Sequence, residues 1–207
     1  MTKIETSRRM MWAMLAVATT LVAAQPATDR LESKTTGLAV TKPHGWHVVV
    51  QQHETNQGNA RWKDEDLLQA MQKGGPVPVF VFTRYPEPHP EGLNPSVQII
   101  LRPLGEMAGR TPNAIMETSI QPLKKAFPDF HFTSEIKAAT IGGRAGSAMK
   151  ATYTLTKEGK KYPTQAGFWI VPRGKLMFLI GTAGPQTGPD VAEPEFDKLV
   201  KSITIQP

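Results

Sequence analysis

The stretch from Phe130 to Thr182 decides the fold, and its sequence is FHFTSEIKAATIGGRAGSAMKATYTLTKEGKKYPTQAGFWIVPRGKLMFLIGT. It contains four runs rich in β-branched and aromatic residues, at 130–140, 147–157, 161–172 and 175–182. Glycine-containing turns separate these runs, namely Gly142-Gly143, Lys157-Glu158-Gly159 and Arg173-Gly174. Runs joined by such tight turns pair with their sequence neighbours as antiparallel strands. The stretch therefore predicts a four-stranded antiparallel meander.

Before the meander, short strands are expected at residues 38–40, 46–50, 77–83 and 97–101. A turn over Lys42-Pro43-His44-Gly45 separates the first two strands. The loop from Tyr85 to Pro95 follows the third strand and contains four prolines. Because the ring of proline fixes its φ angle, this loop is expected to be stiff, and because proline has no N–H to donate to a ladder, the loop should lie outside any sheet interior.

Three helical segments are expected, over residues 64–74, 112–127 and 191–203. Thr111 is typical of a helix N-cap, and Pro122 should kink the helix that contains it. Asp190 and Glu193 have the spacing of a capping box for the last helix. Amphipathic helices at such separate points must cover the faces of a sheet. The predicted fold class is therefore α+β, with an antiparallel sheet and its C-terminal meander in a layered α/β/α sandwich.

Residues 1–24 are typical of an export signal. Basic residues within the first nine positions precede an apolar run over residues 10–24, where Val22 and Ala24 supply the small residues of a cleavage site. The run is shorter than the roughly 20 apolar residues of a membrane-spanning helix, so we expect cleavage after Ala24 and no transmembrane anchor afterwards. Arg8-Arg9 suggests the twin-arginine route, but the Met-Met-Trp that follows favours the general route. We predict a periplasmic or secreted protein.

Residues 25–36 are polar and aperiodic, and they are expected to form a flexible linker before a single domain over residues 37–207. The chain has no cysteine, which excludes disulfides, thiolate zinc sites and iron–sulfur clusters. Removing residues 1–24 lowers the formal net charge from +6 to +4. The basic residues are scattered rather than clustered in a stripe, so no nucleic acid is expected. Weak attraction to anionic lipid or polymer surfaces is the alternative interpretation of this charge.

Three motifs carry a resemblance to a known fold. They are Pro43-His44-Gly45-Trp46 before the second strand, the turn at residues 141–145, and the closing segment at residues 196–203. With the order of strands and helices, they resemble the PsbP-like fold, which is shared by extrinsic photosystem proteins, the Mog family of Ran-binding proteins and DcrB-like envelope proteins of bacteria. The resemblance spans Gly37 to Ile205, and the proline-dense loop and Pro122 depart from it. It implies a domain that acts by docking onto partner proteins.

Catalysis is not predicted. Ser147 and Lys150 form an S-x-x-K motif, whose use in acyl transfer needs both side chains on the same side. In an alternating strand, positions three apart point to opposite faces, so we expect an ordinary surface serine and lysine. The glycines at 142–146 are explained by a hairpin turn, and they lack the G-K-[ST] ending and the helix of a phosphate loop. An envelope hydrolase is the most remote alternative.

The proline-dense loop is the candidate docking site, through four polar and aromatic side chains: Tyr85, Glu87, His89 and Glu91. Prolines pre-order a loop and so reduce the entropy lost when a partner binds it. The candidate metal ligands are His44 and His47. A metal site needs three or four converging groups, and the sequence offers only scattered ones, so neither a metal nor another cofactor is expected.

The leading hypothesis is an exported, non-enzymatic binding or assembly protein that docks onto an envelope protein. The alternative is a periplasmic protein that binds a small ligand or a metal in a cleft between the sheet and the kinked helix. A pocket with converging polar groups would favour the ligand-binding alternative. A flat apolar patch with a polar rim would favour docking.

Overall fold

The computed structural model describes residues 29–51, 62–86, 89 and 92–207. Its strands are β1 (Arg30–Ser33), β2 (Leu38–Thr41), β3 (His47–Gln51), β4 (Val77–Thr83), β5 (Ser96–Pro103), β6 (His131–Ile141), β7 (Arg144–Lys157), β8 (Lys160–Arg173), β9 (Leu176–Pro185) and β10 (Thr204–Ile205). Its helices are α1 (Asp64–Gly74), the 3₁₀ helix η1 (Gly105–Met107), α2 (Pro112–Ser119), α3 (Gln121–Ala126) and α4 (Glu193–Ser202). The expected export signal at residues 1–24 lies outside the described residues, so cleavage after Ala24 stays a prediction.

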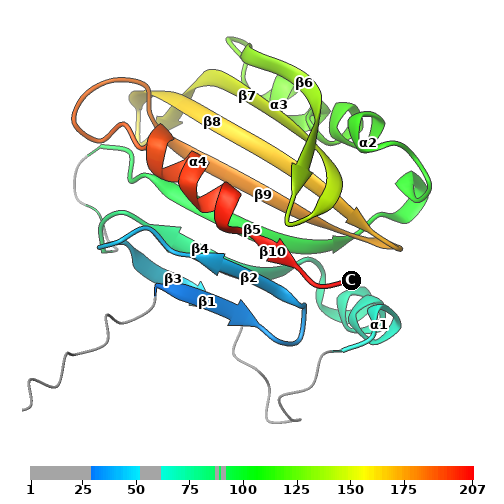
Figure 1. Ribbon diagram of the computed structural model, residues 1–207. Helices are drawn as coiled ribbons and strands as arrows, with labels where there is room; N and C mark the ends of the chain where they lie inside the picture. Colours follow the sequence, from blue (N-terminus) through cyan, green and yellow to red (C-terminus); the bar gives the residue numbers. More distant parts are fainter. Residues whose placement is uncertain (1–28, 52–61, 87–88, 90–91) are drawn as a thin grey trace, which may run out of the picture.

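The strands form two antiparallel sheets. A seven-stranded sheet has the order β3-β4-β5-β9-β8-β7-β6, and a three-stranded sheet has the order β1-β2-β10. Figure 1 shows α4 lying across one face of the large sheet, next to the small sheet, with α2 and α3 behind the large sheet. The predicted α+β class with an antiparallel sheet between outer layers is confirmed, and the small sheet shares one outer layer with α4.

The predicted meander is present, because β6, β7, β8 and β9 are consecutive neighbours in the large sheet. Gly142 and Gly143 turn the chain between β6 and β7 with φ angles of 58° and 79°, a left-handed backbone that glycine adopts without steric cost. A Cβ atom at Gly142 would also lie 2.9 Å from side-chain and backbone atoms of Ile205. The turn is therefore held close against the C-terminal strand β10.

The large sheet has a separate hydrophobic core on each face. Successive side chains of β8 show the division, because Ile170 packs in one core and its neighbours Trp169 and Val171 pack in the other. Met116 of α2 belongs to the first core, and Phe196 of α4 belongs to the second. Since neighbouring residues of a strand point to opposite faces, the position of a residue along β7, β8 or β9 decides whether it faces α2 or α4.

The predicted kink near Pro122 is a break between two helices. The α2 helix ends at Ser119 and α3 begins at Gln121, with Ile120 between them. Thr111 caps α2 as predicted, because its hydroxyl accepts a hydrogen bond from the N–H of Ala114 at 3.3 Å. In the described ranges, no helix combines the length and the apolar character needed to cross a membrane.

Two sequence interpretations of the secondary structure are wrong. Residues 30–33, which fall in the expected linker over residues 25–36, form β1 and pair with β2. The expected capping box of Asp190 and Glu193 does not form, and Ala192 precedes α4 without a side-chain cap. Asp190 instead accepts a hydrogen bond from Tyr85, which is 105 residues away in the sequence. The first error arises because residues 30–33 pair with the neighbouring strand β2 despite their polar sequence, and the second because a distant residue engages Asp190.

Candidate functional site

A cavity of about 210 Å³ lies between α4 and the strands β6 to β9. Three charged side chains at its mouth, Lys150, Glu193 and Asp197, have exposed fractions of 31%, 48% and 43%. Gly167 and Thr182, on the sheet below, are buried. The cavity therefore opens to solvent at a charged rim and deepens toward the sheet.

The floor of the cavity is a row of cross-strand neighbours. Lys150 of β7 lies opposite Gly167 of β8, and Gly167 lies opposite Thr182 of β9. Residues two apart on a strand share a face, so Gln165, Gly167 and Trp169 all face α4. The row thus brings an ammonium, a carboxamide, a hydroxyl and an indole ring to one small area of the sheet.

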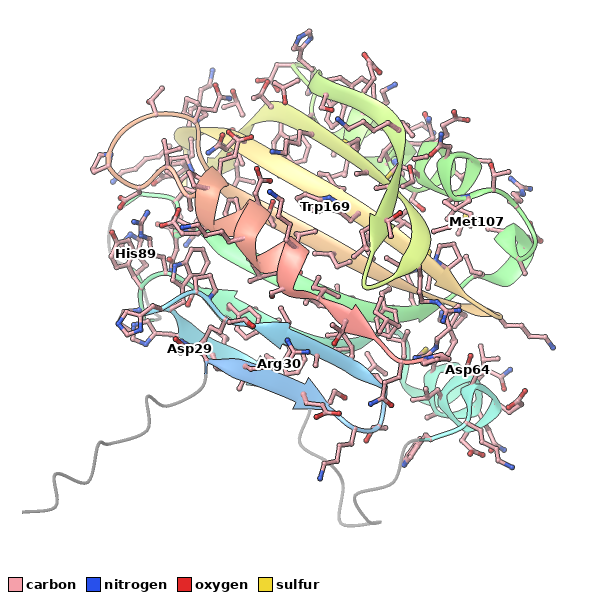
Figure 2. All side chains as sticks on the ribbon, viewed as in Figure 1. Asp29, Arg30, Asp64, His89, Met107 and Trp169 are labelled. Atoms are coloured by element: carbon pink, nitrogen blue, oxygen red, sulfur yellow. The ribbon has the colours of Figure 1, made fainter. Side chains whose placement is uncertain are left out.

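Gly167 makes room for the indole ring of Trp169. A Cβ atom at position 167 would lie 2.4 Å from Cη2 of Trp169 and 2.9 Å from Oγ1 of Thr182. The Thr182 hydroxyl accepts a hydrogen bond from the Gly167 N–H at 3.0 Å. Because position 167 has no side chain, the indole can lie over the strand and form a wall of the cavity. Trp169 is labelled in Figure 2, on the sheet beside α4.

The charged rim is an ion-paired group that joins β7 to α4. Lys150 Nζ lies 2.7 Å from Oε1 of Glu193 and 3.1 Å from Oδ1 of Asp197. The two carboxylates are four residues apart and therefore lie on the same side of α4. Desolvation acts to lower the pKa of Lys150, but the hydrogen bonds to Glu193 and Asp197 and the negative charges of these two carboxylates together outweigh it and raise that pKa. Lys150 is thus a protonated, hydrogen-bonded ammonium at neutral pH.

Gln165 brings an unpaired donor to the cavity. Its side-chain nitrogen Nε2 is one of several buried polar atoms without a hydrogen-bond partner among the described residues, and it is the one that lies in the lining of this cavity. A buried donor that is left unpaired costs about 1–3 kcal/mol of stability, and proteins rarely keep one without a reason. An acceptor atom on a bound molecule would satisfy this nitrogen.

A second, wider depression of about 550 Å³ lies between the start of α2 and the strands β6 and β7. It is next to the broken helix, where the sequence predicts a cleft. Its lining is mostly alanine, glycine and proline, and its polar side chains are Thr111, Asn113 and Thr140. It brings together fewer kinds of polar group than the cavity beneath α4, which is therefore the stronger candidate site.

The loop from Tyr85 to Pro95 is fixed at its base. The side chain of Asn94 accepts a hydrogen bond from the Tyr85 N–H at 3.1 Å and donates one to the Tyr85 carbonyl at 3.0 Å. The Tyr85 ring stacks on His89 with the ring centroids 4.9 Å apart. The other two residues of the predicted docking site, Glu87 and Glu91, lie outside the described residues. Docking through these four residues stays a prediction.

We expect the hydroxyl of Tyr85 to ionise at a higher pH than that of an ordinary tyrosine. It donates a hydrogen bond to Oδ1 of Asp190 at 2.5 Å, and this bond, followed by desolvation, raises the pKa of Tyr85 above its usual value. A raised pKa means that this bond stabilises the fold fully below the unfolded-state pKa and ceases to do so as the pH rises through the folded-state pKa. In an ultraviolet absorbance titration, Asp190→Asn should therefore move one tyrosine ionisation to lower pH.

Tyr162→Phe is the control for that titration, because it removes one of the other two tyrosines and should leave the late ionisation of Tyr85 in place. An unchanged titration curve for Asp190→Asn would contradict the assigned hydrogen bond.

The candidate metal ligands do not converge. His44 Nδ1 lies 3.5 Å from Oδ2 of Asp29, and the other carboxylate oxygen of Asp29, Oδ1, lies 3.0 Å from Nζ of Lys42. The hydrogen bond from Lys42, with a smaller contribution from His44, lowers the pKa of Asp29. His47 is exposed at the start of β3. In the part of the chain that the structure describes, no three metal-ligating side chains come together.

Ser147 and Lys150 point to opposite faces of the sheet, as their spacing predicts. Ser147 is not the expected surface residue, because it is fully buried and its hydroxyl donates to the Lys137 carbonyl at 3.3 Å. Lys150 faces α4 on the other side. The S-x-x-K motif therefore places no serine beside this lysine.

The residues around the cavity were not singled out as a site by sequence motifs, apart from Lys150. One signal was available, because Gly167 interrupts a strand of bulky residues, and glycine inside a strand often marks a close approach of another group. Alternation along β8 also puts Gln165 on the same face as Trp169. The contribution of Glu193 and Asp197 could not be read from the sequence, since it depends on where α4 crosses the sheet.

No family model matches the sequence, and no curated protein is similar to it in sequence. The structure resembles that of the cyanobacterial PsbP protein CyanoP from Synechocystis sp. PCC 6803, with a TM-score of 0.51 and 11% identity over 89% of this chain and 96% of that one. This chain has the PsbP-like fold. The resemblance carried by its sequence motifs is thus confirmed at the level of the fold.

Two other solved structures are similar to this PsbP-like domain. LpqN of Mycobacterium tuberculosis, described as involved in cell envelope biogenesis, is 17% identical over 82% of this chain and 83% of that one, with a TM-score of 0.44. A protein of Bacteroides thetaiotaomicron is 13% identical over 87% of this chain, with a TM-score of 0.45. The chain spans about half of that protein, because it covers 49% of its length.

Proposed function

We propose that this PsbP-like protein is a non-enzymatic binding protein of the cell envelope that holds a small ligand in the cavity beneath α4. The observation that carries the proposal is the convergence of an unpaired Gln165 donor, the Trp169 ring and the charged rim on one cavity. Binding sites for small molecules combine an apolar wall with a few well-placed polar groups in this way.

The surface supports ligand binding over docking through a flat apolar patch. Val48 and Val49 are the exposed large hydrophobic residues of the described surface, with exposed fractions of 41% and 48%. Two neighbouring valines on β3 form a much smaller patch than those that mark protein-binding surfaces. The cavity is therefore the better-supported site.

The chemistry of the rim supports binding without catalysis. A lysine that acts as a general base needs a pKa lowered toward neutrality, whereas the pKa of Lys150 is raised. The nearest motif partner, Ser147, lies on the other face of the sheet. The export pattern of residues 1–24 supports a location in the periplasm or outside the cell.

Titration of isotope-labelled protein by ¹H–¹⁵N NMR tests the proposal. The probes are choline, glycine betaine, glucose and glutamate, which differ in charge and in hydrogen-bonding groups. We expect at least one of them to shift the amide signals of Gly167 and Phe196 and to leave that of Ile115, in the core on the opposite face, unchanged. Shifts scattered over the surface, or no shift with any probe, would overturn the proposal.

Docking onto an envelope protein is the second candidate, and the fixed base of the Tyr85–Pro95 loop favours it. The side chain of Asn94 links both backbone groups of Tyr85, so the ends of the loop are held in place before any partner binds. Cross-linking in the envelope tests it with Asn94→Ala. A cross-linked partner that is lost with this variant would support docking, and retention of that partner would count against it.

A further inference from the structure

We infer that the ligand of the cavity beneath α4 is a small organic cation that carries a hydroxyl or carbonyl acceptor at its other end. This inference rests on the proposed function and adds the chemical class of the ligand. It follows from the charge of the rim, the unpaired donor at Gln165, the aromatic walls and the size of the cavity. Each of these four features excludes a different group of molecules.

The rim attracts positive charge. One ammonium, from Lys150, faces two carboxylates, from Glu193 and Asp197, so the group carries a net charge of about −1 at neutral pH. Lys150 Nζ lies within hydrogen-bond distance of three carboxylate oxygens, Glu193 Oε1 at 2.7 Å and the two oxygens of Asp197 at 3.1 and 3.4 Å. The ammonium of Lys150 is therefore already engaged by two carboxylates, and their remaining lone pairs and excess negative charge favour a cation over an anion.

The unpaired side-chain nitrogen of Gln165 indicates which group the ligand carries at the end opposite its cation. The Nε2 group of Gln165 is buried and needs an acceptor, which a hydroxyl or carbonyl oxygen supplies. Gln165 lies on the sheet, whereas Glu193 lies on α4 across the cavity. A molecule between them must carry an acceptor toward the sheet and a cation toward α4.

The aromatic walls and the volume of the cavity further restrict the molecules that can be its ligand. Trp169 and Phe196 line the cavity, and the faces of aromatic rings attract ammonium groups, most of all when water is excluded. The volume of about 210 Å³ is below the range of roughly 300–1,000 Å³ that accommodates drug-sized ligands. Peptides and lipid chains are therefore too large, and an amino alcohol or a similar small amine fits.

Isothermal titration calorimetry with three matched probes tests the inference. Choline has a cation and a hydroxyl, 3,3-dimethylbutan-1-ol has the same shape without the charge, and glycine betaine keeps the cation but has a carboxylate in place of the hydroxymethyl group. Choline should bind roughly tenfold more tightly than either of the other two. Equal or tighter binding of the neutral alcohol or of the betaine would overturn the inference.

Variants separate the two ends of the ligand. Glu193→Gln should weaken choline binding several-fold, whereas Glu195→Gln, on the same helix but paired with Arg84 at 3.4 Å, should leave it unchanged. Gln165→Leu should weaken choline but not tetramethylammonium, which has no hydroxyl. Equal losses with both glutamate variants, or a loss of tetramethylammonium binding with Gln165→Leu, would contradict the assigned contacts.

The outcomes distinguish this inference from the proposed function. If glucose or glutamate shifts the Gly167 amide and choline does not bind, the cavity is a binding site and its assigned ligand class is wrong. If no probe binds in the cavity, both the proposed function and this inference are overturned.

Discussion

Replacing Gly167 by valine is expected to lower the free energy of unfolding by about 1–3 kcal/mol and to abolish binding in the cavity beneath α4. A Cβ atom at this position would lie 2.4 Å from the Trp169 ring and 2.9 Å from Oγ1 of Thr182. The indole must therefore move off the strand, and we expect it to move into the cavity that it lines beneath α4. That movement fills the cavity. Urea denaturation measures the first effect, and calorimetry with choline measures the second.

Gly181→Ala is the matched control, because it changes another glycine on the neighbouring strand β9. A Cβ atom at Gly181 would lie 4.0 Å from the nearest heavy atom, in the Phe168 ring, which is ordinary contact. This control should keep both stability and binding. Wild-type stability and binding in Gly167→Val would show that the Trp169 ring does not occupy the place described.

Replacing Arg173 by methionine is expected to cost about 3 kcal/mol of stability. Arg173 is 3% exposed, and its guanidinium donates a hydrogen bond to the Thr36 carbonyl, lies 2.9 Å from Oδ1 of Asp64 and stacks 5.1 Å from the centre of the Phe178 ring. Methionine would fill the space of the aliphatic stem, but it would leave the carbonyl and the carboxylate without their partner. Because Asp64 is 28% exposed, water can solvate its carboxylate once the guanidinium is gone. The expected loss of stability is therefore at the lower end of the range for removing one partner of a buried ion pair.

Urea denaturation measures this loss, with Arg102→Met as the control. Arg102 lies on β5 and is only half-buried, so its replacement should change the midpoint little. Because Asp64 begins α1, proteolysis should also cut near α1 sooner in Arg173→Met than in the control. Equal midpoints for the two variants would contradict the role assigned to Arg173.

The meander could be predicted from the sequence because the residues that determine its strand pairing lie close together in the chain. Each turn glycine lies within a few residues of the strands it connects, and antiparallel neighbours follow from the turn alone. The same is true of the start of α2, where Thr111 and Pro112 adjoin the helix that they begin. The break at Pro122 was also predictable, since proline acts on its own turn of helix.

The candidate site could not be predicted because its contacts join distant residues. Lys150 and Glu193 are 43 residues apart, and their pairing depends on the path of α4 across the sheet. Asp190 has the sequence pattern of a helix cap, but Tyr85 engages its carboxylate from another loop. A local sequence pattern shows which structures a residue can adopt with its neighbours in the chain. The tertiary contacts then determine which of these structures forms.

The most direct test of the central claim is an intermolecular NOE measurement on the wild-type protein with choline. If the cavity beneath α4 is the ligand site, NOEs should connect the choline methyl groups to the indole protons of Trp169 and the ring protons of Phe196. They should disappear in Gly167→Val. Bound choline without any NOE to Trp169, or NOEs only to residues elsewhere, would contradict the account.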